Sequence, residues 1–278
     1  MKILCILPVY NGESVVEKAI KSIITQKHTK WELVIINDGS TDKTSLILKS
    51  FADHPQINII DNHVNKGIFY SINKALYTYK NKDWDLFTVH GADDVSSFDR
   101  FSTFSTLFTQ HPQIQVIQSS FSGKVWASNK INPITYELDS INSNSHTKLK
   151  INYLSELKYI KGHLDAFSSM FRKDIFKVVG YYDMGSPTGP SEEYIGRIIE
   201  YCNHCPPKGV SSKKFTKSVV TAMPSSESYM YIKGTHKTSK DIDEQYPAEL
   251  YKDKYLLKCV AKIKAFDTPE KFYYPFTP

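Results

Sequence analysis

Residues 31–42 read WELVIINDGSTD, an apolar run that leads straight into a turn rich in polar side chains. The run LVII has the length and the β-branched content of a buried strand. Two interpretations of the turn are open. In the first, Asn and Asp bond their own backbone, Gly39 takes a positive φ, and Ser40 or Thr41 caps the next helix. In the second, the turn holds part of a ligand.

Strand and helix patterns alternate along the first 120 residues. The first helix opens with the capping-box sequence Ser14-Val-Val-Glu17. The last helix is marked by Phe98, Phe101, Phe104 and Phe108. Short apolar strands are expected at 3–8, 32–36, 57–61, 85–90 and 114–118. This alternation predicts an α/β fold with a Rossmann-like, mostly parallel sheet flanked by helices on both faces.

The rhythm breaks after residue 120. Residues 121–164 are polar and are expected to be irregular, with a low-complexity patch at 139–147. Gly180 is expected to end the helix at 172–179. The remaining expected elements are a strand at 165–171, a helix from 191 with Ile195, Ile198 and Ile199 inward, a strand near 219–223 and a long helix at 248–264.

These patterns suggest how the chain is divided. We predict one domain over 1–224, with a ligand-binding half at 1–120 and a second half at 121–224. A helical C-terminal extension, 225–278, packs on it, and its tail FYYPFTP (272–278) is expected to dock on the body or on a partner. Lysines spaced four apart on helix 248–264 favour a solvated face, with contact to an anionic membrane as the alternative.

The composition narrows the functional class. The chain has 278 residues and a net charge of +6, which suits an anionic ligand. The lysines are dispersed, so nucleic-acid binding is not expected. The sequence has no GxGxxG after its first strand and no GxxxxGK[ST], which disfavours dinucleotide dehydrogenases and P-loop enzymes. Four scattered cysteines and the lack of a leader or membrane span predict a cytoplasmic protein, with peripheral contact to the cytoplasmic membrane face as the alternative.

Polar residues cluster where this architecture places ligands. Ligands of such sheets bind outside the carboxyl ends of the strands, near a topological switch point. Those ends are Tyr10-Asn11, Asp38 and the GADD sequence at 91–94. The clustering favours the ligand interpretation of NDGSTD.

Asp93 and Asp94 close the fourth expected strand. Adjacent carboxylates repel each other, so a pair at a strand end usually has a cation or solvent between them. A hard divalent ion, Mn²⁺ or Mg²⁺, takes one or two carboxylates and completes its shell with substrate phosphates. The alternative is a helix cap ahead of Ser96. The position at the switch point favours the metal.

Six short motifs occur together in this chain. Their order and spacing resemble those of family-2 glycosyltransferases, which are inverting enzymes of the A-type nucleotide-sugar fold. The resemblance covers roughly residues 1–200. The motifs are LPVYNGE (7–13), NDGSTD (37–42), NKG (65–67), GADD (91–94), FRKDIFKVVGYYD (171–183) and SEEY (191–194).

The resemblance implies roles for these residues. Tyr10 packs on the nucleobase, Asp38 hydrogen-bonds it, and Asp93 with Asp94 holds the ribose and the metal on the diphosphate. A mobile C-terminal loop closes over the diphosphate in many relatives, which makes His236 a candidate third metal ligand, with a solvent-exposed histidine as the alternative. The donor-binding residues implied by the motifs are Pro8, Tyr10, Asn11, Glu13, Asp38, Lys66, Gly67, Ala92 and Asp93.

The SEEY motif is implied to supply the general base, which takes a proton from the acceptor hydroxyl. Glu193 is the first choice and Glu192 the rival. In the alternative, Ser191 caps the helix and both glutamates favour its positive end. Arg197, one turn further, either orients a carboxylate or faces solvent. A positioned carboxylate base is typically worth about 10²–10⁴ in rate.

Three positions depart from the family pattern. Gly91 stands where the metal-binding motif opens with an acid, Glu193 is one methylene longer than the usual aspartate, and Ile72 replaces a common arginine; Lys66 or the loop at His236 could compensate for that arginine. We expect an inverting transferase that moves a sugar from a nucleoside diphosphate donor, first of all a UDP-sugar, to a hydroxyl of a glycan or lipid-linked acceptor. The alternative is a non-catalytic glycan- or polyanion-binding protein on the same fold.

Overall fold

The computed structural model describes part of the chain. The described residues are 1–110, 112, 115–118, 121–127, 130–133, 150–153, 167, 169–186, 190–204, 219–223, 229–233 and 272–278. His236, the patch at 139–147 and the expected helix at 248–264 lie outside them. The helical character of the C-terminal extension and the division at residue 224 therefore stay predictions.

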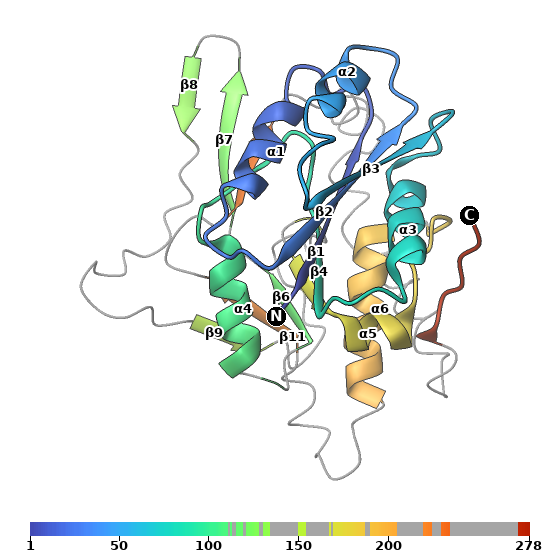
Figure 1. Cartoon of the computed structure of the whole chain (residues 1–278). Helices are drawn as coiled ribbons and strands as arrows, with labels where there is room; N and C mark the ends of the chain where they lie inside the picture. The colour runs from blue at the N-terminus through green and yellow to red at the C-terminus, as the bar shows by residue number, and fades with distance from the viewer. Residues whose placement is uncertain are drawn as a thin grey trace.

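One large sheet organises the molecule (Figure 1). Its first four strands are parallel, and β10 then enters antiparallel between β4 and β6. The α/β prediction is confirmed, with a sheet that is mixed beyond β4. The strand order is β3 (Ile57–Asn62), β2 (Trp31–Asp38), β1 (Ile3–Val9), β4 (Leu86–Val89), β10 (Ser169–Arg172), β6 (Val116–Gln118), β11 (Val219–Met223) and β9 (Lys150–Tyr153).

Helices cover both faces of this sheet, as Figure 1 shows. Side chains alternate along a strand, so β1 sends Leu4 and Ile6 into one core and Ile3, Cys5 and Leu7 into the other. Helices α3 (Ile68–Tyr79), α5 (Lys173–Val179) and α6 (Pro190–His204) pack on the first core. Helices α1 (Val16–Ile24), α2 (Thr44–Lys49) and α4 (Arg100–Gln110) pack on the second.

A second, four-stranded sheet corrects one expectation. Its order is β5 (Val95–Ser96), β12 (Tyr229–Lys233), β7 (Phe121–Ala127) and β8 (Lys130–Pro133). The segment 121–164 was expected to be irregular, yet it contributes β7, β8 and β9. Strand β7 pairs with β12 and β9 pairs with β11, so the partners lie far away in the sequence. Local apolar pattern carries no signal of such pairing.

Two expected helix caps are also wrong. Helix α1 begins at Val16 without a side-chain cap, and Glu17 instead pairs with Lys21 at 2.6 Å. Helix α2 begins at Thr44, whose N–H donates to Asp42 Oδ1 at 2.9 Å. At the start of α1, the N–H groups of Val15 and Val16 donate to the Gly12 carbonyl at 3.0 and 2.9 Å. Phe98 was expected on the helix that became α4, but it precedes that helix and is 62% exposed.

The C-terminal tail docks on the body of the protein. Tyr274 N–H donates to the Val179 carbonyl at 3.0 Å, and Tyr181 N–H donates to the Tyr274 carbonyl at 3.0 Å. The side chains of Phe272 and Phe276 are buried. Of the two destinations that the sequence left open for this aromatic tail, the body is the one observed.

Candidate functional site

Three polar turns meet at the carboxyl edge of the parallel strands. The register pairs Val9 of β1 with Asn37 of β2, and Ile6 of β1 with Val89 of β4. The turns after these strands therefore leave the sheet side by side, and β1 lies between β2 and β4 at the switch point. Tyr10, Asn11, Asp38 and the pair Asp93-Asp94 share this edge, as the sequence predicted.

Hydrogen bonds join the turn after β1 to the turn after β2. Asn11 N–H donates to Ser40 Oγ at 3.0 Å, and Thr41 N–H donates back to Asn11 Oδ1 at 2.8 Å. Asn11 holds a positive φ of 49°. One turn further, Lys43 N–H donates to Glu13 Oε2 at 2.9 Å. Ser40 and Thr41, expected as helix caps, instead fix the position of Asn11, and the exposed Tyr10 ring sits beside this rigid junction.

Asp42 completes the junction. Partial burial raises the pKa of its carboxyl, but hydrogen bonds from the hydroxyl and N–H of Thr44 and from the N–H of Glu13 outweigh this and hold the pKa below its ordinary value. Its two oxygens accept the N–H groups of Thr44 at 2.9 Å and Glu13 at 3.1 Å. Asp42 is therefore a charged structural bridge between the two turns.

Asp38 joins the same edge to the loop before α3. Its buried carboxylate accepts the N–H groups of Lys66 at 3.0 Å and Gly67 at 2.8 Å, and the amide of Asn62 at 2.7 Å. Gly39 has a φ of 72°, and a Cβ there would lie 2.6 Å from the Val64 carbonyl carbon. NDGSTD thus has the turn chemistry of the first interpretation and also positions the NKG loop at the site edge.

Gly91 forms a cradle for the two following carboxylates. A Cβ built on Gly91 would overlap Asp94 Oδ2 and lie 2.9 Å from Asp94 Cγ and 3.1 Å from Asp93 Oδ1. Both carboxylates thus approach the position that a side chain of residue 91 would take, and both residues are buried. The acid that usually opens the motif would have no room here. Two carboxylates turned toward one point are oxygen ligands that suit Mg²⁺ or Mn²⁺.

A buried polar network that sequence reasoning missed supports this cradle from behind. His90 Nδ1 lies 2.8 Å from the Gly91 carbonyl and Nε2 lies 3.0 Å from Ser96 Oγ. Burial, together with the nearby positive charge of Arg100, lowers the pKa of His90 to about 3, so the ring is neutral. A carbonyl only accepts, so Nδ1 carries the proton and Nε2 accepts from the Ser96 hydroxyl.

Arg100 closes the network. Its guanidinium donates to Ser96 Oγ at 3.1 Å and to Thr88 Oγ1 at 3.0 Å, and the side chain is fully buried. A cationic residue on the first turn of a phenylalanine-rich helix resembles a surface residue in sequence, which hides this role. Only the charge so close to GADD could have drawn attention to it.

Helix α6 carries the candidate base. Glu193 is buried, and its two oxygens accept from Arg197 Nε at 2.8 Å and Nη2 at 2.7 Å. Arg197 therefore orients a carboxylate, and the alternative that it faces solvent is wrong. The backbone of Glu192 lies in the same helix, but its side chain is outside the described part of the structure.

The remaining predicted donor-binding residues are Pro8, Ala92 and Lys66, and Ile72 is a departure from the family pattern. Pro8 is buried in β1, and Ala92 packs against the second core. Ile72 is fully buried in the first core. Lys66 lies with its ammonium 5.8 Å above the Tyr70 ring. Among the described residues, no three His, Cys, Asp or Glu side chains gather in a metal-binding group.

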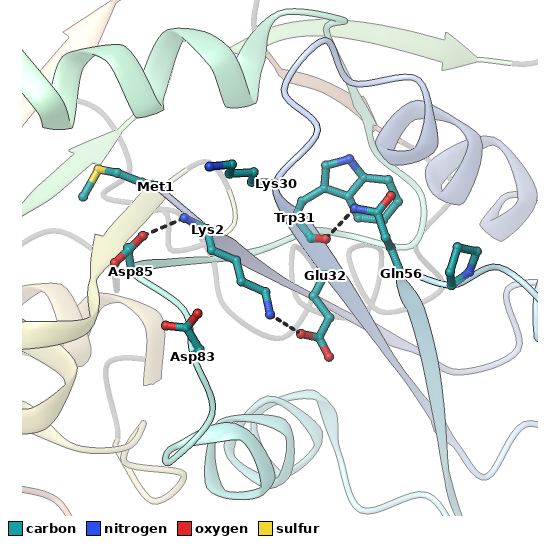
Figure 2. A pocket seen from close by; sticks show the side chains of 9 residues that line it. Met1, Lys2, Lys30, Trp31, Glu32, Gln56, Asp83 and Asp85 are labelled. Carbon is teal, nitrogen blue, oxygen red and sulfur yellow. Dashed lines mark hydrogen bonds and ion pairs between the residues drawn. The ribbon is translucent and has the colours of Figure 1, made fainter.

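A cavity of about 560 Å³ lies at the opposite edge of the sheet (Figure 2). It is lined by residues that precede or begin β1, β2 and β4, including Lys2, Glu32 and Asp85. Lys2 pairs with Glu32 at 3.1 Å, and its N–H donates to Asp85 at 2.7 Å. Lys2 thus binds two of the cavity's carboxylates, and the cavity lies at the opposite ends of the strands from the polar turns, so the site is assigned to the carboxyl edge.

Comparison with known proteins identifies the family. The family model of glycosyl transferase family 2 matches residues 4–180, well over half of the chain. The chain belongs to this family. The match includes the hydrogen-bonded turns after β1 and β2, Asp38, the Gly91 cradle and α5.

Curated relatives of this family-2 chain are similar over shorter stretches. EpsE of Bacillus subtilis is 31% identical over 118 residues, which cover 42% of this chain and 41% of EpsE. A poly-beta-1,6-N-acetyl-D-glucosamine synthase of Staphylococcus epidermidis is 24% identical over 181 residues, covering 64% of this chain and 41% of the synthase. The chain thus spans about two fifths of the length of these relatives.

Solved structures share the fold of this family-2 chain. Staphylococcus aureus TarS 1-349 in complex with UDP superposes with a TM-score of 0.60 at 17% identity, covering 84% of this chain and 60% of that one. Mannosyltransferase PcManGT from Pyrobaculum calidifontis, in complex with GDP-Man and Mn²⁺, gives a TM-score of 0.58 at 12% identity, covering 95% and 64%. These likenesses establish the A-type glycosyltransferase fold that the motifs predicted.

Proposed function

We propose that this chain transfers a sugar from a nucleoside diphosphate donor to a hydroxyl group, with inversion at the anomeric carbon. The observation that carries the proposal is the convergence of the Asp93 and Asp94 carboxylates above Gly91, beside the turns that hold Tyr10 and Asp38. A donor diphosphate is an anion, so two carboxylates can hold it only through a divalent cation that binds both partners. The membership in glycosyl transferase family 2 supports the same reaction class.

The donor is proposed to lie along the edge from β2 to β4. Tyr10 is half exposed, so its ring is available to stack on a base, and three hydrogen bonds fix the position of the Asp38 carboxylate at the end of β2. Pro8, Asn11, Glu13, Gly67 and Ala92 are proposed to contact the donor along the same edge. A UDP-sugar is the first choice, as in the TarS complex, and GDP-mannose in PcManGT marks the alternative.

Asp93 and Asp94 are proposed to hold Mn²⁺ or Mg²⁺ together with the diphosphate oxygens. The bound ion would supply positive charge where the leaving diphosphate becomes more negative, which lowers the barrier. The chain's own part is to turn two carboxylates to one point and to keep a side chain away from residue 91. His236, outside the described residues, stays a candidate third ligand.

The general base is proposed to be a carboxylate of the first turn of α6. Glu193 remains the first candidate because Arg197 fixes its direction, and Glu192 remains the rival. The base takes the proton of the acceptor hydroxyl while that oxygen attacks the anomeric carbon from the face opposite the diphosphate. One displacement inverts the centre. Replacing each glutamate by Gln separately and comparing kcat distinguishes the two.

The acceptor is proposed to be a glycan or a lipid-linked saccharide. Similarity to a polysaccharide synthase supports a growing glycan chain. In the part of the chain that the structure describes, no helix has both the length and the apolar character that a bilayer crossing requires. We propose a cytoplasmic site of action, and peripheral contact with the membrane is the form that a lipid-linked acceptor requires.

A non-catalytic binding protein has less support than the sequence suggested. Its two arguments were Gly91 and Ile72. Gly91 makes room for carboxylates, and Ile72 fills the core, so neither position need reflect a lost donor site. Such a protein predicts that Glu192→Gln and Glu193→Gln leave its binding role unchanged.

The test is thermal stability with UDP, GDP, CDP and dTDP, each with and without Mn²⁺. A ligand that binds only the folded state raises Tm. At a concentration of one hundred times its Kd, it adds about 2.7 kcal/mol to the free energy of unfolding. We expect one diphosphate to stabilise the protein mainly with metal, and Asp93→Asn with Asp94→Asn to abolish the metal-dependent part. Release of that diphosphate from the matching sugar donor on adding an acceptor completes the test. Absence of any shift would count against the transferase.

A further inference from the structure

Arg197 gathers parts of the chain that are far apart in sequence. Besides the paired bonds to Glu193, its guanidinium donates to the Val179 carbonyl, to the Tyr181 carbonyl at 2.8 Å and to the Phe272 carbonyl at 3.2 Å. Only 2% of the side chain is exposed. We call this set the arginine clamp: Arg197, Glu193 and the carbonyls of Val179, Tyr181 and Phe272.

The segment 272–276, which we call the C-terminal strap, closes the clamp from outside. Its backbone pairs with the turn after α5 through Gly180, which has a φ of 71° and no room for a Cβ beside the Tyr274 carbonyl. Its Phe276 ring packs between Tyr70 of α3 and Tyr181, at centroid distances of 5.5 Å each. The strap thus contacts α3, the turn after α5 and, through Arg197, helix α6.

We propose that the arginine clamp and the C-terminal strap position the first turn of α6, so that residues outside the family match are required to place the general base. Arg197 and Phe276 are positioning residues in this proposal. It rests on the proposed function for its effect on catalysis. The mechanical part, that the strap holds α6, does not depend on it.

The physical reason lies in the cost of a buried guanidinium. A buried charge is tolerated only when it is paired and its donors are satisfied. Glu193 accepts only part of the guanidinium's hydrogen bonds, and the backbone carbonyls of Val179, Tyr181 and Phe272 accept the others. If the strap leaves, the Phe272 carbonyl goes with it and water reaches the ion pair. The pair then holds Glu193 less firmly, and the first turn of α6 gains freedom.

The experiment uses the full chain with three variants. Phe276→Ala loosens the strap without touching the clamp, and Arg197→Lys keeps the charge but loses the fork of donors. Thr277→Ala is the matched control, because this residue lies just after the strap and is exposed. For each, we measure kcat and KM, the Tm shift on adding the stabilising nucleotide with Mn²⁺, and amide hydrogen exchange over residues 190–198.

We expect Phe276→Ala and Arg197→Lys to lower kcat by up to about 10²-fold, the loss that a small misplacement of a catalytic group causes. Amides 190–198 exchange faster in both, while the nucleotide-dependent Tm shift stays as in the parent protein. Thr277→Ala changes none of these. If Phe276→Ala fails to fold, Arg197→Lys and its exchange pattern decide.

Any one of three outcomes overturns the proposal. In the first, both variants keep kcat within roughly twofold of the parent. In the second, amides 190–198 exchange as slowly as before. If the parent protein itself binds nucleotide but transfers no sugar, the proposed function fails, and the exchange measurement alone still decides whether the strap holds α6. A nucleotide shift lost along with kcat also contradicts it, because the strap then acts on the whole fold rather than on α6.

Discussion

Gly91 shows how one residue changes the interpretation of a motif. By comparison with the family pattern it is a missing acid, but in the structure its lack of a side chain is what lets Asp94 fold back toward Asp93. The number of carboxylates at the cradle is smaller than the pattern expects. Their convergence on one point is kept.

We predict that Gly91→Ala weakens metal-dependent nucleotide binding by about tenfold, or about 1.4 kcal/mol. The new Cβ overlaps the end of the Asp94 side chain, which can swing away, so the protein stays folded while the cradle opens. Calorimetric titration of UDP with Mn²⁺ measures the change. Gly185→Ala is the control, because a Cβ there meets only Asp183 Oδ1 at 3.5 Å. Equal affinity in both variants would rule out the cradle as the metal site.

His90 predicts a dependence of stability on pH. Its pKa is about 3 in the folded protein and 6.5 when unperturbed, so the unfolded chain binds the extra proton between these values. Stability is therefore lost as pH falls from 6.5 toward 3, by at most about 1.4 kcal/mol per pH unit from this group. His90→Gln keeps a donor and an acceptor and should flatten Tm against pH.

The control for that prediction is His63→Gln, because His63 is exposed. It should leave the slope of Tm between pH 7 and pH 4 unchanged. A parent-like slope in His90→Gln would mean that other groups carry the acid sensitivity.

Among the secondary-structure elements, Asn73 joins α3 to the turn after α5 through two hydrogen bonds. Its amide donates to the Tyr182 carbonyl at 2.9 Å, and its Oδ1 accepts the Tyr182 N–H at 2.9 Å. The Tyr182 ring stacks on Tyr194 of α6 at 4.1 Å. One buried amide thus ties together the three helices of the first core, next to the candidate base.

We predict that Asn73→Ala lowers the free energy of unfolding by about 2–5 kcal/mol, because it leaves two buried backbone groups without their partner. Chemical denaturation of both proteins measures this. Asn58→Ala removes an exposed asparagine and should change stability by less than about 0.5 kcal/mol. A similar small loss in Asn73→Ala would show that water replaces the amide.

For the whole molecule, the junction of β4 and β10 decides how the two predicted halves relate. Strands β10, β6 and β11 extend the sheet begun by β1–β4, so the halves at 1–120 and 121–224 share one sheet. Phe87 of β4 stacks on Phe171 of β10 at 4.8 Å and contacts Tyr194 of α6. The core therefore crosses the predicted boundary.

We predict that Phe87→Ala lowers stability by about 3–5 kcal/mol and leaves a single unfolding transition. The cavity lies where both halves pack, so both should lose stability together. Phe98→Ala, at an exposed phenylalanine, is the control and should change little. Two separated transitions in calorimetry would show instead that the halves fold independently.

Elements of the fold that depend on local sequence signals were predicted, and those that depend on pairing between distant segments were missed. The strands through β4 were expected within one or two residues because alternating apolar runs and loop residues are local signals. Strands β7 and β9 were missed because their partners lie far along the chain. The cap at Ser14 was wrong because α1 begins two residues later, at Val16. The cap at Ser40 or Thr41 was wrong because the turn after β1 uses the hydrogen-bonding groups of both residues.

By itself, the sequence determined the α/β class, the edge at which polar turns meet, and the residue types available there. These follow from side-chain periodicity and from the fact that parallel strands end at one edge. Tertiary contacts set what each group faces: the carboxylates over Gly91, the neutral His90 hydrogen-bonded to the Gly91 carbonyl, and Arg197 hydrogen-bonded to a strap residue 75 positions away in the sequence. Burial and long-range hydrogen bonds set those arrangements, and they depend on segments that touch only after the chain has folded.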